Sequence, residues 1–343
     1  TMSSMHYVGL DVHKKVIAYC VKTRGGRLRG QGIIPATREG LDAWLSERRG
    51  PWSAAMEATL FTGWIYDYLA PHARDLKVAH PLMLRAIACS KKKNDRIDAE
   101  KIADLLRADL LPECYMAPTQ IRELRRVLRY RNLLVRQAVR MKNKTAGLLM
   151  EVGAEYSKKR LHGKRYFDDL MASAEDVPKS VIAMARHCHE FMTLFMSVQK
   201  ELLARLRAAP LVRERVERLM TIDGVGEVNA LTWVLEVSEP TRFATRNQVI
   251  SYCGLCGGQA ESAGKTKRTP LSKQRNKHLQ RMLIEAANLA PRWNTRLAEI
   301  HARELDRGNR NRATLEVARR LAALLWAIDK SGEPYDPHRN TDS

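Results

Sequence analysis

The sequence predicts three parts: an α/β domain at 5–112, a central α-helical coiled coil at 118–209, and a mainly α-helical C-terminal domain at 211–331. A polar tail follows at 332–343. Three observations predict this division. Short apolar runs alternate with helical patterns up to about residue 111. Glycine and proline then become scarce while leucine and valine recur at three- and four-residue steps, which predicts a long helix to about residue 150, a basic link at 158–165 and a returning helix over about 178–208. Short helical patterns fill the remainder.

The N-terminal part has the pattern of three strands, a helix, a strand, a helix, a strand and further helices. Strand-like runs lie at 7–10, 16–21, 32–34, 53–56 and 76–79. Helices are expected at about 38–49, at 62–70, from 81 onwards and over 95–110. Thr37 precedes the first helical pattern and is expected to cap it. This order of elements is that of an RNase H-like domain.

Four acidic residues of this domain stand out by position. Asp11 and Glu57 end the first and fourth strands, which are parallel neighbours in such a sheet, so both carboxylates emerge at one edge. Asp95 and Asp98 lie three residues apart on one face of the last helix. Convergent carboxylates repel unless cations lie between them, and oxygen ligands select Mg²⁺ or Mn²⁺. We therefore expect a divalent-metal site that suits phosphodiester cleavage.

Each of these acids also has a plain alternative. Asp95 and Asp98 fit the start of any helix, where the dipole favours negative charge, and Glu57 fits an exposed strand end. Only the combination in this strand order favours a metal site. His6 and His13 flank Asp11, and no chemistry is assigned to them.

The charge balance indicates a polyanionic partner. The chain has 59 Lys and Arg against 38 Asp and Glu, a formal net charge of +21. Such a chain gains affinity for nucleic acid by releasing the counterions of each phosphate it neutralises. No apolar run is long enough to span a membrane, and no signal peptide is evident at the first residues. The six scattered cysteines favour free thiols in a reducing compartment. We expect a cytoplasmic protein of a prokaryotic cell, associated with the nucleoid.

Positive charge is concentrated in two segments. Residues 119–165 hold 14 Lys and Arg and 3 Asp and Glu, and residues 262–284 hold seven Lys and Arg and no acid. A solvated helix face would explain the first segment, but it has few acids to pair with. Phosphate contacts are therefore expected from Arg125, Arg126, Arg129, Lys142, Lys144, Lys265, Lys267, Arg268, Lys273 and Arg275.

The C-terminal part contains further candidate motifs. Residues 219–228 have the shape of a helix-hairpin-helix, although a plain turn between helices is nearly as good an interpretation. Helices are expected at 245–252, 274–290, 293–306 and 311–329. Small residues surround Ser262 in an acid-free, basic loop, which suits a hydroxyl that attacks phosphorus. Residue pattern alone does not choose Ser262 over Ser272, Thr266 or Thr269, and a loop that only grips DNA remains an alternative.

A lone Cys-x-x-Cys pair, Cys253 and Cys256, lacks a second pair at zinc-binding spacing. Buried thiols are the better interpretation of this pair.

At these residues the chain resembles the DEDD transposase family, in the insertion-sequence "one-ten" group, which also includes the pilin-gene DNA invertases. The resemblance extends over nearly the whole chain. It is carried by Gly9-Leu10-Asp11, Met56-Glu57-Ala58-Thr59, Lys93-Asn94-Asp95-Arg96-Ile97-Asp98-Ala99, the stretch from Ile222 to Gly226, and Glu261-Ser262. One departure is Ala263, because similar members often have glycine directly after the serine.

The resemblance implies a RuvC-like, RNase H-like catalytic domain in which Asp11, Glu57, Asp95 and Asp98 bind Mg²⁺. It implies that Ser262 in the C-terminal transposase domain forms a covalent link to DNA. It also implies a composite active site, a homo-oligomer (dimer or tetramer), and a structured bridge RNA that pairs with donor and target DNA.

Two other functions compete with this expectation. A hydrolytic RNase H-like nuclease or Holliday-junction resolvase would use the same carboxylates with water as nucleophile, leaving Ser262 without a role. A non-catalytic RNA- or DNA-binding protein would leave the four carboxylates unexplained, because acids oppose phosphate binding unless a metal intervenes. A covalent protein–DNA adduct would separate the recombinase from the nuclease.

Overall fold

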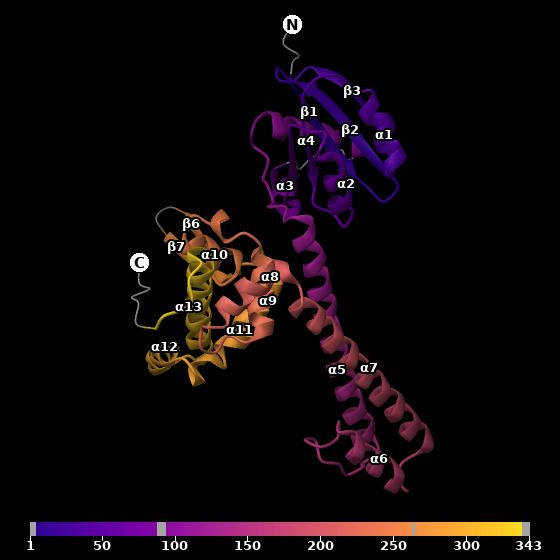
Figure 1. The fold of residues 1–343 in the computed structure, drawn as a ribbon, viewed down its shortest axis with the longest axis vertical. Coiled ribbons are helices and arrows are strands. Elements are labelled where there is room, and N and C mark those ends of the chain that lie inside the picture. Colours follow the sequence, from indigo (N-terminus) through magenta and orange to yellow (C-terminus); the bar gives the residue numbers. More distant parts are fainter. Residues whose placement is uncertain (1–4, 88–93, 263–264, 338–343) are drawn as a thin grey trace. The chain divides into compact units, whose positions relative to one another are not determined.

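A computed structural model describes residues 5–87, 94–262 and 265–337, with all side chains except those of 86–87 and 259–269. The chain divides into two compact units, residues 1–119 and 120–343 (Figure 1). The first is a mixed α/β unit and the second is mostly helical, in agreement with the expected fold class.

The first unit is built on a five-stranded sheet in the order β3-β2-β1-β4-β5. Strands β1, β2 and β3 are antiparallel, whereas β4 and β5 run parallel to β1. The strands are β1 (His6–Val12), β2 (Val16–Thr23), β3 (Leu28–Pro35), β4 (Trp52–Glu57) and β5 (Asp75–Ala79). All five lie where the sequence predicts them, and β1 and β4 are the expected parallel neighbours.

Helices cover both faces of this sheet. They are α1 (Arg38–Ser46), α2 (Thr62–Leu69), α3 (Pro81–Ile87) and α4 (Asp95–Arg107). Alternate β1 residues Val8, Leu10 and Val12 pack in the main core with residues of α1 and α2. Residues of α3 and α4 pack in smaller clusters with the opposite side chains of the sheet. Thr37 caps α1 as expected, because its side chain accepts a hydrogen bond from Gly40 N at 3.1 Å.

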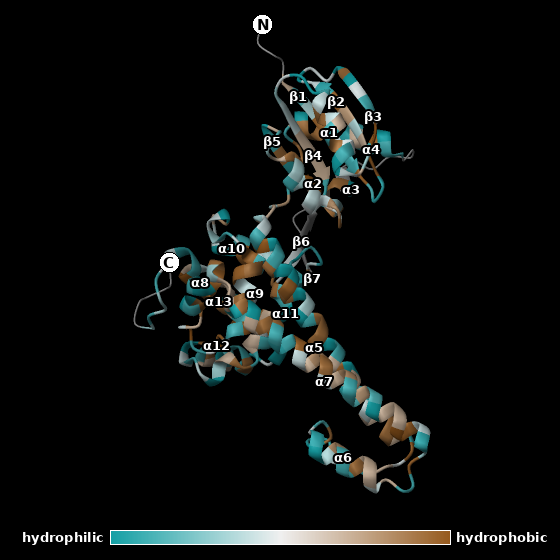
Figure 2. Ribbon diagram, turned by 45° about the vertical axis from the view of Figure 1, so that its right-hand side comes forward, coloured by the Kyte–Doolittle hydropathy of each residue, from teal (hydrophilic) through white to brown (hydrophobic). Residues whose placement is uncertain are grey.

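The second unit begins with a long helical hairpin. Helices α5 (Thr119–Glu151) and α7 (Lys179–Arg207) match the predicted pair, and Arg131 Nε of α5 donates to Gln199 Oε1 of α7 at 3.0 Å. Hydrophobic and hydrophilic residues alternate along both helices (Figure 2). The link between them, predicted only as a basic segment, contains α6 (Lys164–Ser173). Phe167 and Met171 of α6 are buried with Leu149 and Ala185, which explains why this short segment is helical.

The remainder is a helical bundle with one small hairpin of strands. Its elements are α8 (Pro210–Leu219), α9 (Glu227–Val237), η1 (Pro240–Arg242), α10 (Arg246–Tyr252), β6 (Gly257–Ser262), β7 (Lys265–Leu271), α11 (Lys277–Ala287), η2 (Ala290–Arg292), α12 (Thr295–Asp306) and α13 (Arg310–Ser331). Helix α9 is buried from Ala230 to Val237, and α13 packs against α8, α10, α11 and α12. The four helices expected here are present, with ends shifted by up to three residues. In the part of the chain that the structure describes, no helix is long and apolar enough to cross a membrane.

Candidate functional site

Strand β1 presents Gly9, Asp11 and His13 in succession towards α4. Side chains alternate along a strand, so these residues share the face opposite Val8, Leu10 and Val12. His13 continues this face just beyond the end of the strand. A histidine two residues after Asp11 is therefore expected to lie on the same side of the strand as Asp11. No chemistry was expected of His13 from the sequence, although this spacing was the signal for it.

Gly9 allows α4 to lie directly on β1. A Cβ atom at Gly9 would overlap the carbonyl oxygen of Ala99 and the amide nitrogen of Ala103. The small residues Ala99 and Ala103 complete this close packing, and both are fully buried. Because the helix backbone sits so near the strand, the first turn of α4 comes next to the end of β1.

Polar contacts fix where α4 begins and how it lies on the sheet. Asn94 caps the helix, with its side chain accepting from Ile97 N at 2.8 Å. Lys22 of β2 donates from Nζ to Glu100 at 2.8 Å and to Asp104 at 2.6 Å. The Lys22 side chain is nearly buried, whereas the Glu100 and Asp104 side chains are partly exposed at the surface of α4.

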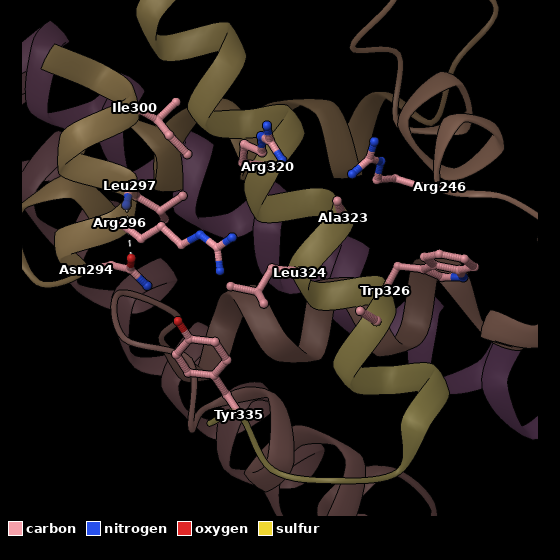
Figure 3. Close-up of a pocket in the computed structure, with 11 residues that line it drawn as sticks. Arg246, Asn294, Arg296, Leu297, Ile300, Arg320, Ala323, Leu324, Trp326 and Tyr335 are labelled. Carbon is pink, nitrogen blue, oxygen red and sulfur yellow. Dashed lines mark hydrogen bonds between the residues drawn. The ribbon is translucent and has the colours of Figure 1, made fainter. Parts of the chain in front are cut away.

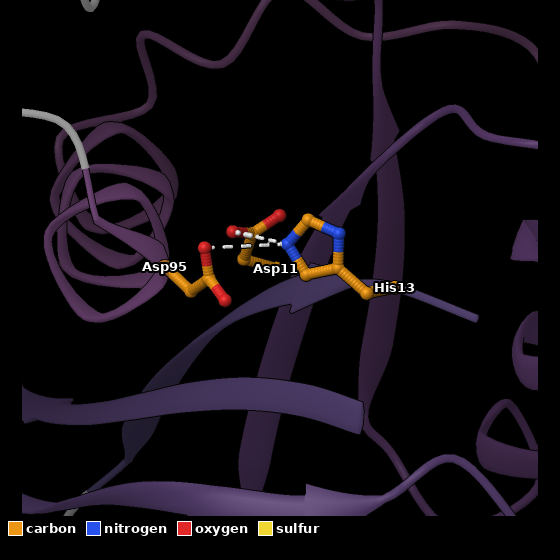
Figure 4. A group of neighbouring side chains, drawn as sticks. All are labelled: Asp11, His13 and Asp95. Atoms are coloured by element: carbon orange, nitrogen blue, oxygen red, sulfur yellow. Dashed lines mark hydrogen bonds and ion pairs between the residues drawn. The ribbon is translucent and has the colours of Figure 1, made fainter. Parts of the chain in front are cut away.

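Asp11, His13 and Asp95 meet at this end of the sheet (Figure 4). His13 Nε2 lies 3.2 Å from Asp11 Oδ2 and 3.5 Å from Asp95 Oδ1. One ligand atom from each of the three residues lies within 4.8 Å of the other two. Asp11 is mostly buried, with 13% of its side chain exposed, whereas half of Asp95 is exposed. The group is therefore anchored inside the fold and open to solvent on the Asp95 side.

The Asp11 carboxyl lies in an environment that disfavours its charged form. Burial raises its pKa, and the nearby His13 lowers it in part. The negative charges of Asp95 and Asp98 raise the pKa further, and the net result lies above the ordinary value of 3.8. Asp98 therefore lies near enough to act on Asp11, although its own closest ion pair is with Lys101 at 3.7 Å.

Glu57 ends β4 on the face that also carries Ala55, which packs towards α4. The turn that follows it is held by Thr62, whose hydroxyl donates to the Glu57 carbonyl at 2.9 Å. Leu10 of β1 pairs with Met56 of β4, so Asp11 and Glu57 are the next residues of adjacent parallel strands. The structure thus places Glu57 at the same sheet edge as Asp11, outside the tight group with His13.

The residues present fit a hard divalent cation. Carboxylate oxygens on two elements converge, and burial, together with the repulsion from Asp95 and Asp98, raises the pKa of Asp11. A cation at this point would relieve that repulsion and supply the positive charge that the buried carboxylate lacks. The imidazole of His13 is an additional nitrogen donor, which Mn²⁺ accepts more readily than Mg²⁺.

Ser262 lies at the turn end of a β-hairpin. Its backbone pairs with Lys265, while Gly257 and Leu271 pair near the other end of the hairpin. The segment was expected to be a loop, and the finding of two paired strands corrects this. The side chains of Ser262, Lys265, Lys267 and Arg268 lie outside the described residues, as do Ala263 and Gly264 altogether.

Ser272 belongs to the base of the same hairpin. Its amide donates to Cys256 O at 3.1 Å, and its hydroxyl accepts from Gln274 N at 3.1 Å. Arg275 donates to the Ser272 carbonyl, and Lys273 is exposed. Lys273 and Arg275 precede α11 rather than lying in it, because Asn276 caps that helix.

Cys253 is fully buried, and burial raises the pKa of its thiol.

Arg125 and Arg129 have internal partners. Arg129 forms two hydrogen bonds with the Glu236 carboxylate, at 2.8 and 2.7 Å, and Arg125 Nε donates to Leu235 O at 2.7 Å. Asn276 donates to the same carboxylate at 3.0 Å. These contacts give the two arginines a role in holding α5 to the bundle. Arg126 and Lys144 are exposed and Lys142 is half-buried, so these three remain placed to meet a ligand.

The predicted helix-hairpin-helix corresponds to α8, a short turn and α9. Gly224 in the turn has φ +89°, and a side chain there would meet Ala290. Glu227 begins α9 and pairs with Arg207. This geometry is that of two helices joined by a tight turn, and the motif itself stays a prediction.

Comparison with known proteins yields matches to transposases. Residues 8–153 match a family model of IS110-type DEDD transposases, described as "Transposase". Residues 216–302 match the model "Transposase IS116/IS110/IS902 family". The transposase for insertion sequence element IS1328 of Yersinia enterocolitica is 23% identical, covering 83% of this chain and 86% of its own length. The transposase for insertion sequence element IS1111A of Coxiella burnetii is 25% identical, covering 71% and 68%.

Proposed function

Since this chain belongs to the IS110-type family of DEDD transposases, we propose that it cuts and rejoins DNA strands with a carboxylate metal site and a serine nucleophile. The convergence of Asp11, His13 and Asp95 at one sheet edge is the observation that carries this proposal. The family accounts for DNA as the substrate, and the net charge of +21 suits a nucleic-acid partner.

Asp11, Glu57, Asp95 and Asp98 are proposed to hold Mg²⁺ or Mn²⁺, with His13 beside them. Asp11 would be the central ligand, because it is the most enclosed and is surrounded by the other acids. The bound cation would stabilise the charge that develops on the phosphodiester during cleavage. The close packing of Gly9 on α4 keeps Asp11 and Asp95 in place without any rearrangement.

Ser262 is proposed as the nucleophile. Its Oγ would form a bond to phosphorus while the bond from phosphorus to one sugar oxygen breaks. The serine proton passes to a base, and the departing sugar oxygen takes up a proton. A phosphoserine link conserves the energy of the broken ester, so the strand can be rejoined to a new end. The backbone of Ser262 lies at the turn end of the hairpin, whereas Ser272 lies at its base, where its hydroxyl accepts a hydrogen bond from Gln274 N.

Denaturing electrophoresis of a labelled DNA substrate tests this proposal with wild type, Ser262→Ala and Ser272→Ala. Wild type and Ser272→Ala should give a covalent, slowly migrating adduct in the presence of Mg²⁺. Ser262→Ala should give none while retaining DNA binding. An adduct that persists in Ser262→Ala and vanishes in Ser272→Ala would move the nucleophile. Free cleavage products without an adduct from any variant would identify a hydrolytic nuclease.

The helical hairpin is proposed to be a coiled-coil arm for assembly into a homo-oligomer and for binding nucleic acid, including a structured bridge RNA. The positive charge of α5 and the resemblance to RNA-guided family members support this proposal. Phosphate contacts are assigned to Arg126, Lys142 and Lys144 on the arm. In the C-terminal part they are assigned to Lys265, Lys267, Arg268, Lys273 and Arg275.

Charge reversal on the arm tests this assignment. Lys142→Glu with Lys144→Glu should weaken RNA and DNA binding and flatten the log–log salt dependence by about 1 to 2 units, because fewer counterions are released. Lys200→Glu with Arg205→Glu is the matched control on α7, where both residues are exposed. Equal slopes for wild type and the α5 variant would contradict the assignment, as would an equal effect of the control.

A further inference from the structure

A small cavity between α12 and α13 is lined by cationic side chains of three helices, Arg246, Arg296 and Arg320 (Figure 3). It measures about 70 Å³, and aliphatic side chains form much of the remaining wall. Arg320 also lies 3.8 Å from the Glu316 carboxylate. The cavity therefore forms part of the packing of these helices. The junction between the middle of α5 and the start of α11 is different, because cations are exposed there.

The start of α11 is tied to the middle of α5 through one buried carboxylate. Glu236 of α9 accepts two hydrogen bonds from Arg129 of α5, at 2.8 and 2.7 Å, and one from Asn276 at 3.0 Å. The Asn276 side chain also caps α11 and accepts a hydrogen bond from the His278 amide at 3.0 Å. Lys277 and His278, in the first turn of α11, are therefore held next to α5.

A row of exposed cations on α5 leads away from this junction. Arg136, Arg140 and Lys144 follow one another at four-residue steps, so they lie on one face of the helix and are separated by about 6 Å of helix rise. Residues 124–150 of α5 and 277–284 of α11 contain no acid. In the part of the chain that the structure describes, Arg136 and Arg140 form no ion pair with an acid. The row is therefore open to an external polyanion.

The imidazole of His278 lies half-buried among these charges. Burial lowers its pKa below the ordinary value of 6.5, and the carboxylate of Glu236 raises it in part. The positive charges of Arg129, Lys277 and Arg136 lower it further, so the imidazole is uncharged at neutral pH. An uncharged imidazole can donate one N–H to a phosphate oxygen. A phosphate bound here would also offset the surrounding positive charge and so favour the protonated imidazole.

We propose that the junction of α5 and α11 holds a backbone phosphate of a nucleic acid between Arg136, Lys277 and His278, and that His278 takes up a proton from solvent when the phosphate binds. A backbone phosphate fits better than a free anion because the row of cations continues along α5. Ser272 and Arg275, at the base of the serine hairpin, directly precede α11, so the strand would run beside that base. The inference rests on the proposed function only in taking nucleic acid as the partner.

The pH dependence of binding tests the role of His278. Labelled single-stranded DNA, duplex DNA and single-stranded RNA of equal length are titrated against the full-length protein between about pH 5.5 and 8 at constant ionic strength. A group whose pKa rises on binding strengthens binding as pH falls through its value in the complex, so wild type should bind about threefold to tenfold more tightly at the acid end. His278→Gln should lose this gain. His278→Lys should bind tightly at neutral pH with little dependence on pH, which a purely structural role of the imidazole would not produce. His301→Gln, at a half-buried histidine of α12, is the control and should respond to pH as wild type does.

Removal of the two neighbouring charges tests the phosphate site itself. Arg136→Gln with Lys277→Gln should weaken binding of at least one of the three nucleic acids about tenfold and lower its log–log salt slope by about 1 to 2 units. Lys200→Gln with Arg205→Gln, two exposed cations of α7, is the control and should change binding less than about twofold. The nucleic acid that is affected identifies the source of the phosphate, and thermal unfolding first shows that each variant folds.

The titration of His278 can also be followed directly, by NMR of protein labelled with ¹³C in its histidine rings. The signal that is lost in His278→Gln should titrate at higher pH when the affected nucleic acid is bound. The proposal is overturned if His278→Gln keeps the wild-type pH response, if both double variants weaken binding equally, or if only inorganic phosphate shifts this titration. These binding measurements do not depend on the Ser262 adduct, so either proposal can fail while the other holds.

Discussion

At the scale of single residues, the site depends on which face of a strand each side chain occupies. Asp11 and His13 project to the same side of β1, and only the burial of Asp11 distinguishes it from an ordinary strand-end acid. Burial and the neighbouring negative charges together raise the pKa of Asp11. A buried carboxylate with other acids nearby opposes folding in the absence of a cation and favours binding of one.

The first prediction concerns Asp11→Asn. Mg²⁺ or Mn²⁺ should raise the thermal unfolding temperature of the wild type by mass action, because the ion binds the folded state. Asp11→Asn should lose this response. Without added ion the variant should be at least as stable as wild type at neutral pH, because the amide removes a charge that the folded state disfavours. Differential scanning fluorimetry with and without the ion measures both effects.

Glu39→Gln is the control for that experiment. Glu39 is an exposed acid in the first turn of α1, away from the site, so this variant should keep the full response to the ion. An ion-dependent rise in Asp11→Asn equal to that of wild type would place the metal site elsewhere.

At the scale of elements, the packing of α4 on β1 determines whether the carboxylates meet. The contact depends on Gly9 facing Ala99 and Ala103, since any side chain at Gly9 would collide with the backbone of the helix. Lys22 and its two acidic partners then hold the helix against rotation. Gly9 and Ala99 belong to the motifs that carry the family resemblance, and both must be small because the strand and the helix pack so closely.

Gly9→Ala tests this contact. The added methyl must displace the backbone of α4, so we expect a loss of about 1 to 3 kcal/mol in the free energy of unfolding, as for other overpacked cores. The displacement should also weaken the stabilisation by Mg²⁺, because Asp95 moves away from Asp11. Urea unfolding measures the first effect, and the ion-dependent shift in unfolding temperature measures the second. Gly25→Ala, at a position with open space around it, should be nearly neutral. Wild-type behaviour of Gly9→Ala would show that the close contact is not needed.

At the scale of the whole second unit, one buried carboxylate joins three helices. The Glu236 side chain of α9 is fully buried and accepts hydrogen bonds from Arg129 of α5 and Asn276 at the start of α11. Burial by itself would raise the Glu236 pKa, but the bonds from Arg129 and Asn276 and the charge of Arg125 lower it below 4.5. The helical arm and the segment that carries the serine hairpin are thereby anchored to one point.

Glu236→Gln should destabilise the unit by about 3 kcal/mol at neutral pH, because it leaves the arginine charge partly buried without its partner. A carboxylate with a lowered pKa stabilises the fold fully above its unfolded-state value and loses this effect as pH falls through the folded value. The difference between wild type and Glu236→Gln should therefore shrink below about pH 4.5. Urea unfolding at pH 7 and at acid pH checks this, with Glu285→Gln, an exposed ion-pair partner, as control. A difference that stays constant with pH would contradict the role of this carboxylate.

The sequence by itself determined the elements and the acids at their ends. Periodicity predicts the five strands of the sheet, the two long helices of the arm and four helices of the bundle, α10 to α13, because hydrophobic spacing directly reflects which face of each element is buried. Asp11, Glu57, Asp95 and Asp98 were found in the same way, from their positions at strand ends and a helix start. The strands around Ser262 and the buried helix α6 were missed. Their residues are basic, small or irregularly spaced, and the fold of each depends on pairing or packing with neighbouring segments.

Only the tertiary structure decided which charged side chains are exposed to a ligand and which are paired within the protein. Arg125 and Arg126 are adjacent in sequence and equally basic, yet one donates to the backbone of α9 and the other is exposed. His13 of β1 and Asp95 of α4, far apart in the sequence, came together with Asp11 in the candidate site. The physical reason is that the strength of an electrostatic interaction depends on the distance between the charges and on their burial. Both are set by contacts between residues far apart in the chain.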